Sequence, residues 1–268
     1  MSEPYILWLG GIFTPSAVSQ FLAVNPAANR WRIGFINGLN TNGVATQLVS
    51  HRTEQCWPKG QLFPGRKEEF SVDYSQHVVH FTNAPVVRFR HLPVAYTQCV
   101  KRVLKNYGKP AAVLNYNPYS WNLGACRYLS QKEGIKWINV TLDYDDPTLD
   151  NWATYKKDSL GADGHVFLSN WAYENCPLGA RFHLDAGVDW INEPKLAASL
   201  PVGRKKIVLY SGKINSEYGG ADILAETLAA ISHEDIRLIV CGKGGHPELE
   251  KLSKIDSRVE LKGFVSDQ

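Results

Sequence analysis

The hydrophobic pattern of the chain alternates between two kinds of segment. Short apolar runs, which predict buried strands, are separated by stretches in which apolar residues recur every three or four positions, which predict amphipathic helices. Over the first two thirds of the chain we expect strands at 5–9, 32–36, 78–81, 111–115, 136–142, 164–168 and 181–184. Helices are expected at 14–24, 92–105, 121–132, 149–160 and 170–175, and a long surface loop at 52–70. This alternation predicts an α/β, Rossmann-like domain built on a mainly parallel sheet.

The pattern is interrupted at residues 192–206, which contain Pro194, Pro201 and a basic cluster. The alternation then restarts, with strands expected at 206–210, 236–241 and 259–261 and helices at 222–231 and 247–254. We therefore predict an N-terminal Rossmann-like domain over 1–192, a linker over 193–205 and the first part of a second Rossmann-like domain over 206–268. The 268 residues correspond to about 1.8 domains of roughly 150 residues, which agrees with one complete domain and part of another.

Composition narrows the class of protein. Hydrophobic residues make up 44% of the chain and the formal net charge is +3, which indicates a folded protein without a nucleic-acid-binding surface. No apolar run approaches the roughly 18 residues of a membrane span. Glu3 stands where a secretory leader would carry positive charge, so we expect a cytoplasmic protein.

Ligands of open α/β sheets bind beyond the carboxyl ends of the strands, so the residues that follow the expected strands are candidates. They are Gly10, Gly11, Asn37, Gly38, Asn115, Asn117, residues 143–146, Ser169, residues 212–220 and residues 242–245. Gly10 and Gly11 allow close approach of the backbone to a ligand, and the helix that follows favours an anion there. A plain tight turn explains the two glycines equally well.

A second glycine-containing segment follows the first strand of the second unit. Gly212 and Lys213 stand after that strand, and Gly219 and Gly220 precede a helix. A lysine beside the free N–H groups of a helix start suits a diphosphate. The alternative is a solvated lysine on a loop.

Asp143, Asp145 and Asp146 form the sharpest acidic cluster. Their carboxylates could hold Mg²⁺ or Mn²⁺ on a nucleotide, or one of them could act as a base or orient a sugar hydroxyl. Because Pro147 follows, Asp145 or Asp146 is also a natural helix N-cap.

The second unit resembles a known family. VLYSGKINSEYGGADILAETL, RLIVCGKGG and RVELKGFVSDQ, in this order, resemble the start of the C-terminal domain of glycosyltransferase family 4 (glycosyl transferases group 1), which has the GT-B fold. In the first unit, ADGHVFLSNWA and AGVDW resemble the family segments that precede the crossing between domains. The resemblance covers residues 160–265, whereas residues 1–110 match only in general pattern.

The resemblance implies transfer of a hexosyl group from a UDP- or GDP-sugar to a hydroxyl acceptor, a saccharide or lipid-linked saccharide, in glycan or polysaccharide synthesis. It implies retention of anomeric configuration, no essential metal and no cofactor beyond the nucleotide-sugar substrate. An acceptor held in a membrane would bring the protein to the inner face of that membrane as a peripheral protein.

The resemblance also assigns roles to residues. The donor and its phosphates would contact Gly10, Gly11, Gly212, Lys213, Gly219, Gly220 and Gly242, and the catalytic residues would be Asp143, Asp145 and Lys213. The acceptor side would hold Asn115, Asn117, Asp146 and Ser169.

The chain departs from the family at two places. Tyr218 stands before Gly219 where the family often has a second lysine. The acidic donor motif of the family, two glutamates separated by seven residues, would fall after Gln268. We therefore expect the chain as given to be incomplete for catalysis, to need a further segment or a partner, and to expose a sheet edge and an apolar surface.

Three alternatives stay open at this point. The chain could be a non-catalytic binding or scaffold module derived from the same fold. Asp143-Tyr144-Asp145 could be the metal motif of the other glycosyltransferase fold, GT-A, although the restart of alternation after residue 205 argues against it. A nicotinamide oxidoreductase is disfavoured because the chain lacks G-x-G-x-x-G.

Overall fold

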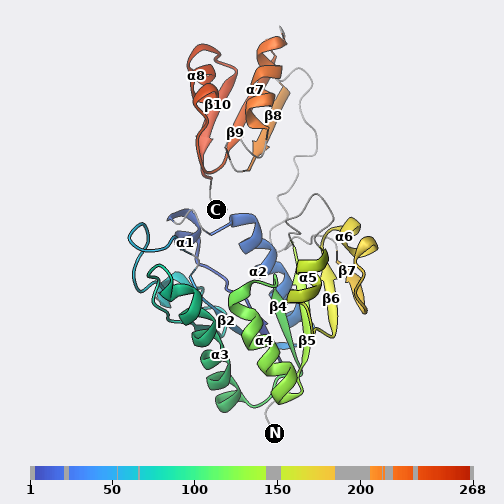
Figure 1. The fold of residues 1–268 in the computed structure, drawn as a ribbon. Helices are drawn as coiled ribbons and strands as arrows, with labels where there is room; N and C mark the ends of the chain where they lie inside the picture. Colours follow the sequence, from blue (N-terminus) through green and yellow to red (C-terminus); the bar gives the residue numbers. More distant parts are fainter. Residues whose placement is uncertain are drawn as a thin grey trace. The chain divides into compact units, whose positions relative to one another are not determined.

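The computed structural model describes residues 4–20, 24–52, 54–65, 67–142, 152–184, 206–212, 214, 220–231 and 235–265. The chain divides into two compact units, Met1–Ile191 (unit 1) and Asn192–Gln268 (unit 2). Both units consist of parallel strands and helices (Figure 1). None of the helices in the described ranges is long and apolar enough to cross a membrane.

Unit 1 is built on a seven-stranded parallel sheet with the order β3-β2-β1-β4-β5-β6-β7. The strands are β1 (Tyr5–Leu9), β2 (Ala45–Ser50), β3 (Gln76–Val78), β4 (Ala112–Tyr116), β5 (Lys136–Thr141), β6 (Gly164–Phe167) and β7 (Arg181–His183). The helices are α1 (Pro15–Gln20), α2 (Pro26–Thr41), α3 (Val87–Tyr107), α4 (Ser120–Glu133), α5 (Trp152–Asp158) and α6 (Asn170–Asn175), with a short 3-10 turn at Lys67–Glu69.

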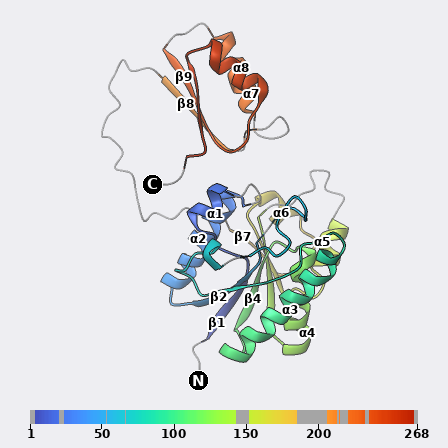
Figure 2. The same ribbon diagram turned by 90° about the vertical axis from the view of Figure 1, so that its left-hand side faces the viewer.

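Helices cover both faces of this sheet because alternate residues of a strand point to opposite sides. Leu7 and Leu9 of β1 pack in the cluster formed with α3 and α4. Trp8, between them, packs with Trp31 of α2 in a second cluster. Figure 2 shows α2 on one side of the sheet and α3 and α4 on the other. Burial on both faces explains why β1, with the sequence YILWL, is apolar throughout.

The expected strand at 32–36 is wrong, because these residues lie in α2. Asn25 caps this helix by accepting the N–H of Ala28 at 3.2 Å, and Pro26 occupies its first turn. Trp31 and Phe35, four residues apart, stack with ring centroids 5.1 Å apart. The cap and the stacked pair outweigh the local strand preference of the apolar run.

Two consequences follow from this correction. The second strand is β2 at Ala45–Ser50, where no strand was expected. Asn37 and Gly38, named above as a strand end, lie inside α2 instead, so they do not belong to the carboxyl edge of the sheet.

The remaining expected elements of unit 1 are present with shifted ends. The third strand, β3, is earlier and shorter than the expected 78–81, and α3 begins five residues before the expected position 92 and contains Pro93. The expected helix at 14–24 is α1 to Gln20, and residues 21–23 lie outside the described ranges. Gly134 ends α4 in the left-handed conformation, with φ 71°, as the C-terminal glycine of a helix commonly does.

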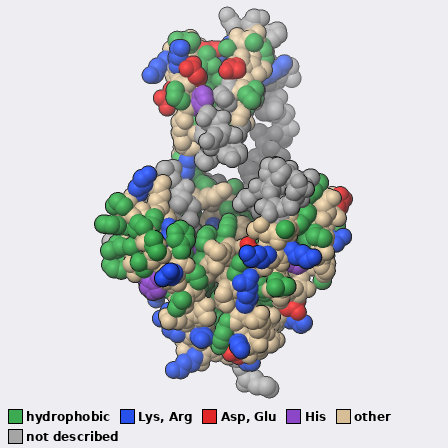
Figure 3. Space-filling view, viewed as in Figure 1, with side chains coloured by type: hydrophobic (Ala, Val, Ile, Leu, Met, Phe, Trp, Pro, Cys, Tyr) green, Lys and Arg blue, Asp and Glu red, His purple; other side chains and the backbone are tan. Residues whose placement is uncertain are grey.

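Exposed apolar side chains gather where the 54–65 loop meets the start of α3. Asn83 anchors the loop, donating from Nδ2 to the carbonyl oxygens of Gln55 and Gln61 at 2.7 and 2.8 Å. Phe63 and Phe89 are 70% and 76% exposed in this part of unit 1. Figure 3 shows a concentration of hydrophobic side chains on that side of unit 1.

Unit 2 has a three-stranded parallel sheet with the order β10-β9-β8. Its elements are β8 (Lys206–Ser211), α7 (Ala221–Ala230), β9 (Ile236–Cys241), α8 (Pro247–Ile255) and β10 (Val259–Gly263), close to the expected bounds. Both helices lie on one side of the sheet (Figure 2), where they bury Leu238 and Val240 of β9.

The other face of the unit 2 sheet is apolar and exposed, as expected from the sequence. Ile207 and Leu209 of β8 are 62% and 64% exposed, and Leu209 pairs in register with Ile239 of β9. Leu238, one position away on β9, is 1% exposed because it faces the helices. The sheet of unit 2 is therefore covered by helices on one face only within the described residues.

Leu238→Ala and Leu209→Ala test this one-sided core with the same chemical change. Leu238→Ala should lower the free energy of unfolding by about 2–5 kcal/mol, because it removes a buried side chain and leaves a cavity. Leu209→Ala should change it by less than about 0.5 kcal/mol, because its side chain is already in solvent. Urea denaturation followed by circular dichroism measures both, and equal losses would show that the Leu209 face is covered.

Candidate functional site at the carboxyl edge

The strand order defines one position in unit 1 where a ligand is expected. From β1 the chain passes to β2 and β3 on one side, and it then crosses to β4 on the other side of β1. At such a switch point the connections diverge, and open α/β sheets bind ligands beyond the strand ends there. The residues that follow β1 and β4 therefore form the centre of the candidate site.

Gly10 and Gly11 follow β1 and lie tightly against side chains of the sheet. The Gly10 N–H donates to the carbonyl oxygen of Val49 on β2 at 2.9 Å. A Cβ atom on Gly10 would lie 2.6 Å from Trp8 Nε1, and one on Gly11 would lie 2.5 Å from Ser50 Oγ. Both positions therefore require glycine for packing, in addition to the ligand contact that the sequence predicts.

Side chains from distant segments fix the loop after the two glycines. The Gln76 side chain accepts a hydrogen bond from the Ile12 N–H at 3.0 Å and donates one to the Ile12 carbonyl at 2.9 Å. Its amide therefore satisfies both backbone groups of Ile12, as a neighbouring strand would. Asn29 of α2 makes the same pair of bonds with Phe13, at 2.9 and 3.2 Å. The Thr14 N–H donates to the carbonyl of Glu69 at 3.1 Å. The loop is thus held rigidly at the sheet edge.

The predicted residues Asn115 and Asn117 lie at and just beyond the end of β4. Asn115 is fully buried and donates from Nδ2 to Asn139 Oδ1 at 2.9 Å. Asn117 has a φ of 52°, a left-handed conformation that asparagine tolerates better than most residues. Its Oδ1 accepts the Leu142 N–H at 3.0 Å and its Nδ2 donates to the Tyr119 hydroxyl at 2.9 Å. Asn117 therefore ties the ends of β4 and β5 together.

Ser169 follows β6 and begins α6. Its hydroxyl accepts the N–H of Ala172 at 3.3 Å, which is an N-cap interaction. This structural role accounts for the residue in the geometry observed. Its predicted place on the acceptor side stays a prediction.

Several predicted site residues lie outside the described ranges. They are Asp143, Asp145, Asp146, Lys213 and Gly219. Their predicted roles stay predictions.

In unit 2 the predicted glycines bring two loops into contact. The Gly212 N–H donates to the Cys241 carbonyl at 3.0 Å, and the Gly242 N–H donates to the Gly263 carbonyl at 2.8 Å. A Cβ atom on Gly242 would lie 1.7 Å from the Gly212 carbonyl oxygen, so no side chain fits. Gly220 has a φ of 66° at the N-cap of α7, a conformation that favours glycine.

Buried polar atoms without a hydrogen-bond partner gather at the carboxyl edge of unit 1. Five of them are Trp8 Nε1, Ser50 Oγ, His51 Nε2, Asn115 Oδ1 and Asn122 Oδ1. They come from β1, the end of β2, β4 and the first turn of α4. Native proteins rarely leave buried polar atoms unpaired, and the exceptions often mark a site that a ligand or water completes. The orphaned atoms therefore identify this edge independently of the strand order.

His51 is a buried titratable group at this edge. Its ring lies 5.3–5.7 Å from the rings of Phe81, Tyr96 and Trp121, and its Nδ1 is 3.3 Å from the Tyr96 hydroxyl. Burial, followed by the nearby charge of Arg88, lowers the pKa of His51 to about 3. His51 is therefore neutral at physiological pH.

Sequence reasoning missed Trp8, Ser50 and His51. Ser50 is the last residue of β2 and His51 comes directly after it. This strand was not predicted, because its mixed sequence ATQLVS lacks a clear apolar run. Trp8 lies inside a strand that was predicted, but only packing shows that its indole N–H has no partner. Among the described residues, no group of three or more His, Cys, Asp or Glu could hold a metal ion.

No protein-family model matches the chain, and no curated protein matches it. Solved structures do. The lipopolysaccharide outer core galactosyltransferase WaaB, in its apo form, aligns over 98% of this chain and 68% of its own, with a TM-score of 0.57 at 15% identity. Anabaena HepE in complex with UDP and glucose aligns over 98% and 70%, with a TM-score of 0.59 at 15% identity. The chain has the GT-B fold. The fold class predicted from the sequence is confirmed, whereas membership of glycosyltransferase family 4 stays a prediction.

Gly11→Ala and Gly38→Ala test the packing of the glycine loop with identical substitutions. Gly11→Ala should destabilise the protein by about 1–3 kcal/mol, because the new methyl group overlaps Ser50. Gly38→Ala should stabilise it by about 0.5–1 kcal/mol, because Gly38 lies inside α2 with nothing within 4 Å of a Cβ. Thermal unfolding decides both, and a stable Gly11→Ala variant would contradict the close packing.

The neutral state of His51 predicts a pH dependence of stability. Between the folded pKa of about 3 and the ordinary value of 6.5, the unfolded chain binds the additional proton, so stability falls as the pH is lowered through this window. The slope from one such group is at most about 1.4 kcal/mol per pH unit. His51→Gln should reduce the slope measured by urea denaturation from pH 6 to pH 4.

Proposed function

We propose that this protein is a glycosyltransferase that transfers a sugar from a nucleotide-sugar to a hydroxyl acceptor. The observation that carries the proposal is the gathering of Gly10, Gly11 and the orphaned polar atoms at the β1–β4 switch point. This edge belongs to a fold shared with the galactosyltransferase WaaB and with HepE. Glycosyl transfer depends on positioning two substrates and on stabilising a leaving diphosphate, and a rigid edge with unpaired polar atoms suits both.

The donor in this proposal is a UDP-sugar, and the transferred group is a hexose. HepE has been solved with UDP and glucose and with UDP-glucose, which supports this choice over a GDP-sugar. The acceptor is a saccharide or lipid-linked saccharide bound by unit 1. Transfer proceeds with retention and without a metal ion, as the family resemblance implies.

Roles within the proposal follow the sequence prediction. Lys213 and the backbone N–H groups at the start of α7 stabilise the leaving diphosphate, since a positive charge and a helix N-terminus both favour an anion. The left-handed Gly220 at the N-cap of α7 supports this part of the proposal. Asp143 or Asp145 contacts the reacting centre, and Asn115 and Asn117 shape the acceptor side.

The test measures UDP release and product formation from UDP-glucose and UDP-galactose, with GDP- and ADP-sugars as comparison donors. Lys213→Ala should lower kcat by about 10²–10³-fold, which is typical for loss of one charge-stabilising donor. Lys254→Ala, at an exposed lysine of α8, should leave kcat unchanged. EDTA should have no effect, and NMR of the product should show the anomeric configuration of the donor.

The outcomes separate the candidate functions. Turnover that is unaffected by Lys213→Ala would remove the diphosphate role of that residue. Binding of a nucleotide-sugar without turnover would favour the binding or scaffold module.

A further inference from the structure

Arg32 is a buried cation in unit 1 that has no counter-ion among the described residues. It lies in α2 and is 8% exposed. Its hydrogen bond with the described residues runs from Nε to the carbonyl oxygen of Ala28 at 3.0 Å. No described carboxylate lies within ion-pair distance of it. The two terminal amino groups, with which an arginine donates paired hydrogen bonds to an anion, are therefore available to another partner.

Arg52 shows how this protein otherwise compensates a buried guanidinium. The Arg52 side chain is 4% exposed and forms ion pairs with both Glu54 and Glu69. Burial of a charge is costly unless an opposite charge and hydrogen bonds accompany it. Arg52 satisfies this requirement with Glu54 and Glu69, whereas Arg32 has no such partner in the part of the chain that the structure describes.

Aromatic rings hold the Arg32 guanidinium in place. It lies 4.9 Å from the ring centroid of Tyr116 and 5.6 Å from that of Phe13. Such contacts orient a cation but do not neutralise it. Burial lowers the pKa of Arg32, and the nearby Tyr116 acts in the opposite direction.

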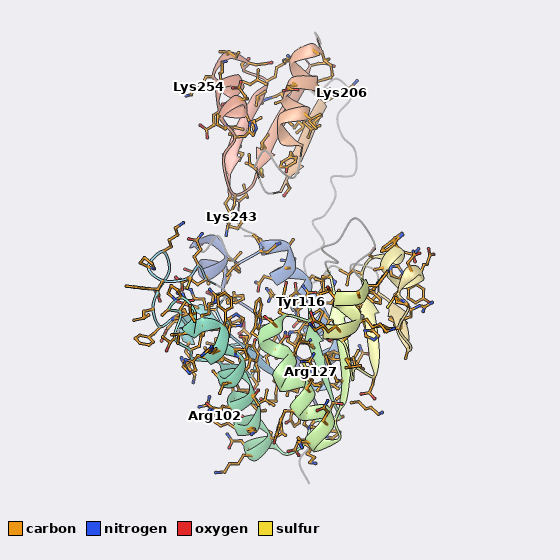
Figure 4. All side chains as sticks on the ribbon, in the orientation of Figure 1. Arg102, Tyr116, Arg127, Lys206, Lys243 and Lys254 are labelled. Atoms are coloured by element: carbon orange, nitrogen blue, oxygen red, sulfur yellow. The ribbon has the colours of Figure 1, made fainter. Side chains whose placement is uncertain are left out.

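These rings place Arg32 at the switch point. Phe13 belongs to the loop that follows Gly10 and Gly11, and Tyr116 is the last residue of β4. Figure 4 shows Tyr116 toward the end of the sheet where β4 finishes, whereas Arg102 lies toward the other end of unit 1. The charge is therefore beside the strand ends at which the ligand is expected.

A second donor without an acceptor lies next to the same tyrosine. Trp8 Nε1 is buried and unpaired, and the ring centroids of Trp8 and Tyr116 are 5.8 Å apart. A Cβ atom on Gly10 would lie 2.6 Å from Trp8 Nε1 and 3.1 Å from Tyr116 Cβ. The backbone of Gly10 therefore lies directly against Trp8 and Tyr116, and a side chain at position 10 would overlap both.

We propose that Arg32, positioned by Phe13 and Tyr116, binds a phosphoryl group at the β1–β4 switch point. The planar guanidinium presents paired N–H donors that match phosphate oxygens. The phosphoryl group comes either from the donor diphosphate or from a phosphorylated acceptor. The two possible sources of the phosphoryl group rest on the proposed function. Binding of the anion itself does not, because it is measured without any sugar transfer.

Isothermal titration calorimetry of the full chain with pyrophosphate, UDP, glucose 1-phosphate and uridine tests the proposal. Arg32→Met removes the charge and keeps an apolar side chain of similar length. It should weaken pyrophosphate binding at least tenfold and leave uridine binding unchanged. Arg127→Met is the matched control, because Arg127 lies on α4 away from the sheet edge (Figure 4) and its loss changes the net charge equally.

Thermal unfolding distinguishes an anion site from a structural cation. Pyrophosphate should raise the unfolding temperature of the wild-type protein but not that of Arg32→Met. Without anion, Arg32→Met should be at least as stable as the wild type, because an uncompensated buried charge is removed. If Arg32→Met does not fold, Arg32→Lys, which retains the charge without the planar fork, should show an intermediate loss of pyrophosphate affinity.

The ligands identify the source of the phosphoryl group. Loss of UDP affinity in Arg32→Met assigns it to the donor, and loss of glucose 1-phosphate affinity with unchanged UDP affinity assigns it to a phosphorylated acceptor. If the wild type binds none of the anions, or if Arg32→Met binds them equally well, the proposal is overturned. Failure of the glycosyltransferase proposal would appear separately, as absence of turnover with anion binding intact.

Discussion

Burial of β1 on both faces is the constraint on which unit 1 depends. Leu7 and Leu9 pack under α3 and α4, Trp8 packs under α2, and hydrogen bonds to β2 and β4 occupy both edges of the strand. A strand enclosed in this way has no solvent-facing side along its length. Polar chemistry is therefore displaced to its carboxyl end, where Gly10 and Gly11 follow. The position of the candidate site is a consequence of how the core is closed.

The same packing links stability to the site. The two glycines touch Trp8 and Ser50, whose polar atoms have no partner, so the tightest backbone approach in the loop coincides with unsatisfied donors. Side-chain bonds from Gln76 and Asn29 hold the loop in that conformation without a ligand. A site that is held rigidly in advance loses little conformational entropy on binding, which is what a transferase that acts by positioning requires.

In unit 2, helices bury the sheet on one face only within the described residues. Leu238 and Val240 pack against α7 and α8, whereas Ile207 and Leu209 are exposed. A parallel sheet is normally covered on both faces, because its strands are apolar on both. The contacts among Gly212, Gly242 and Gly263 nevertheless close the loop ends of this sheet tightly.

The sequence by itself determined the α/β class, most strands and helices, and the glycines at the ends of β1 and β8, because apolar runs and turn residues are local signals. It predicted residues 32–36 as a strand, because the apolar run is a local signal. The cap at Asn25 and the Trp31–Phe35 stack, which make this segment a helix, became visible only in the structure. Only the tertiary structure decided which polar atoms lack partners, and that the described residues place aromatic rings but no carboxylate beside Arg32. Pairing of buried groups depends on residues far apart in the chain, and no local pattern records it.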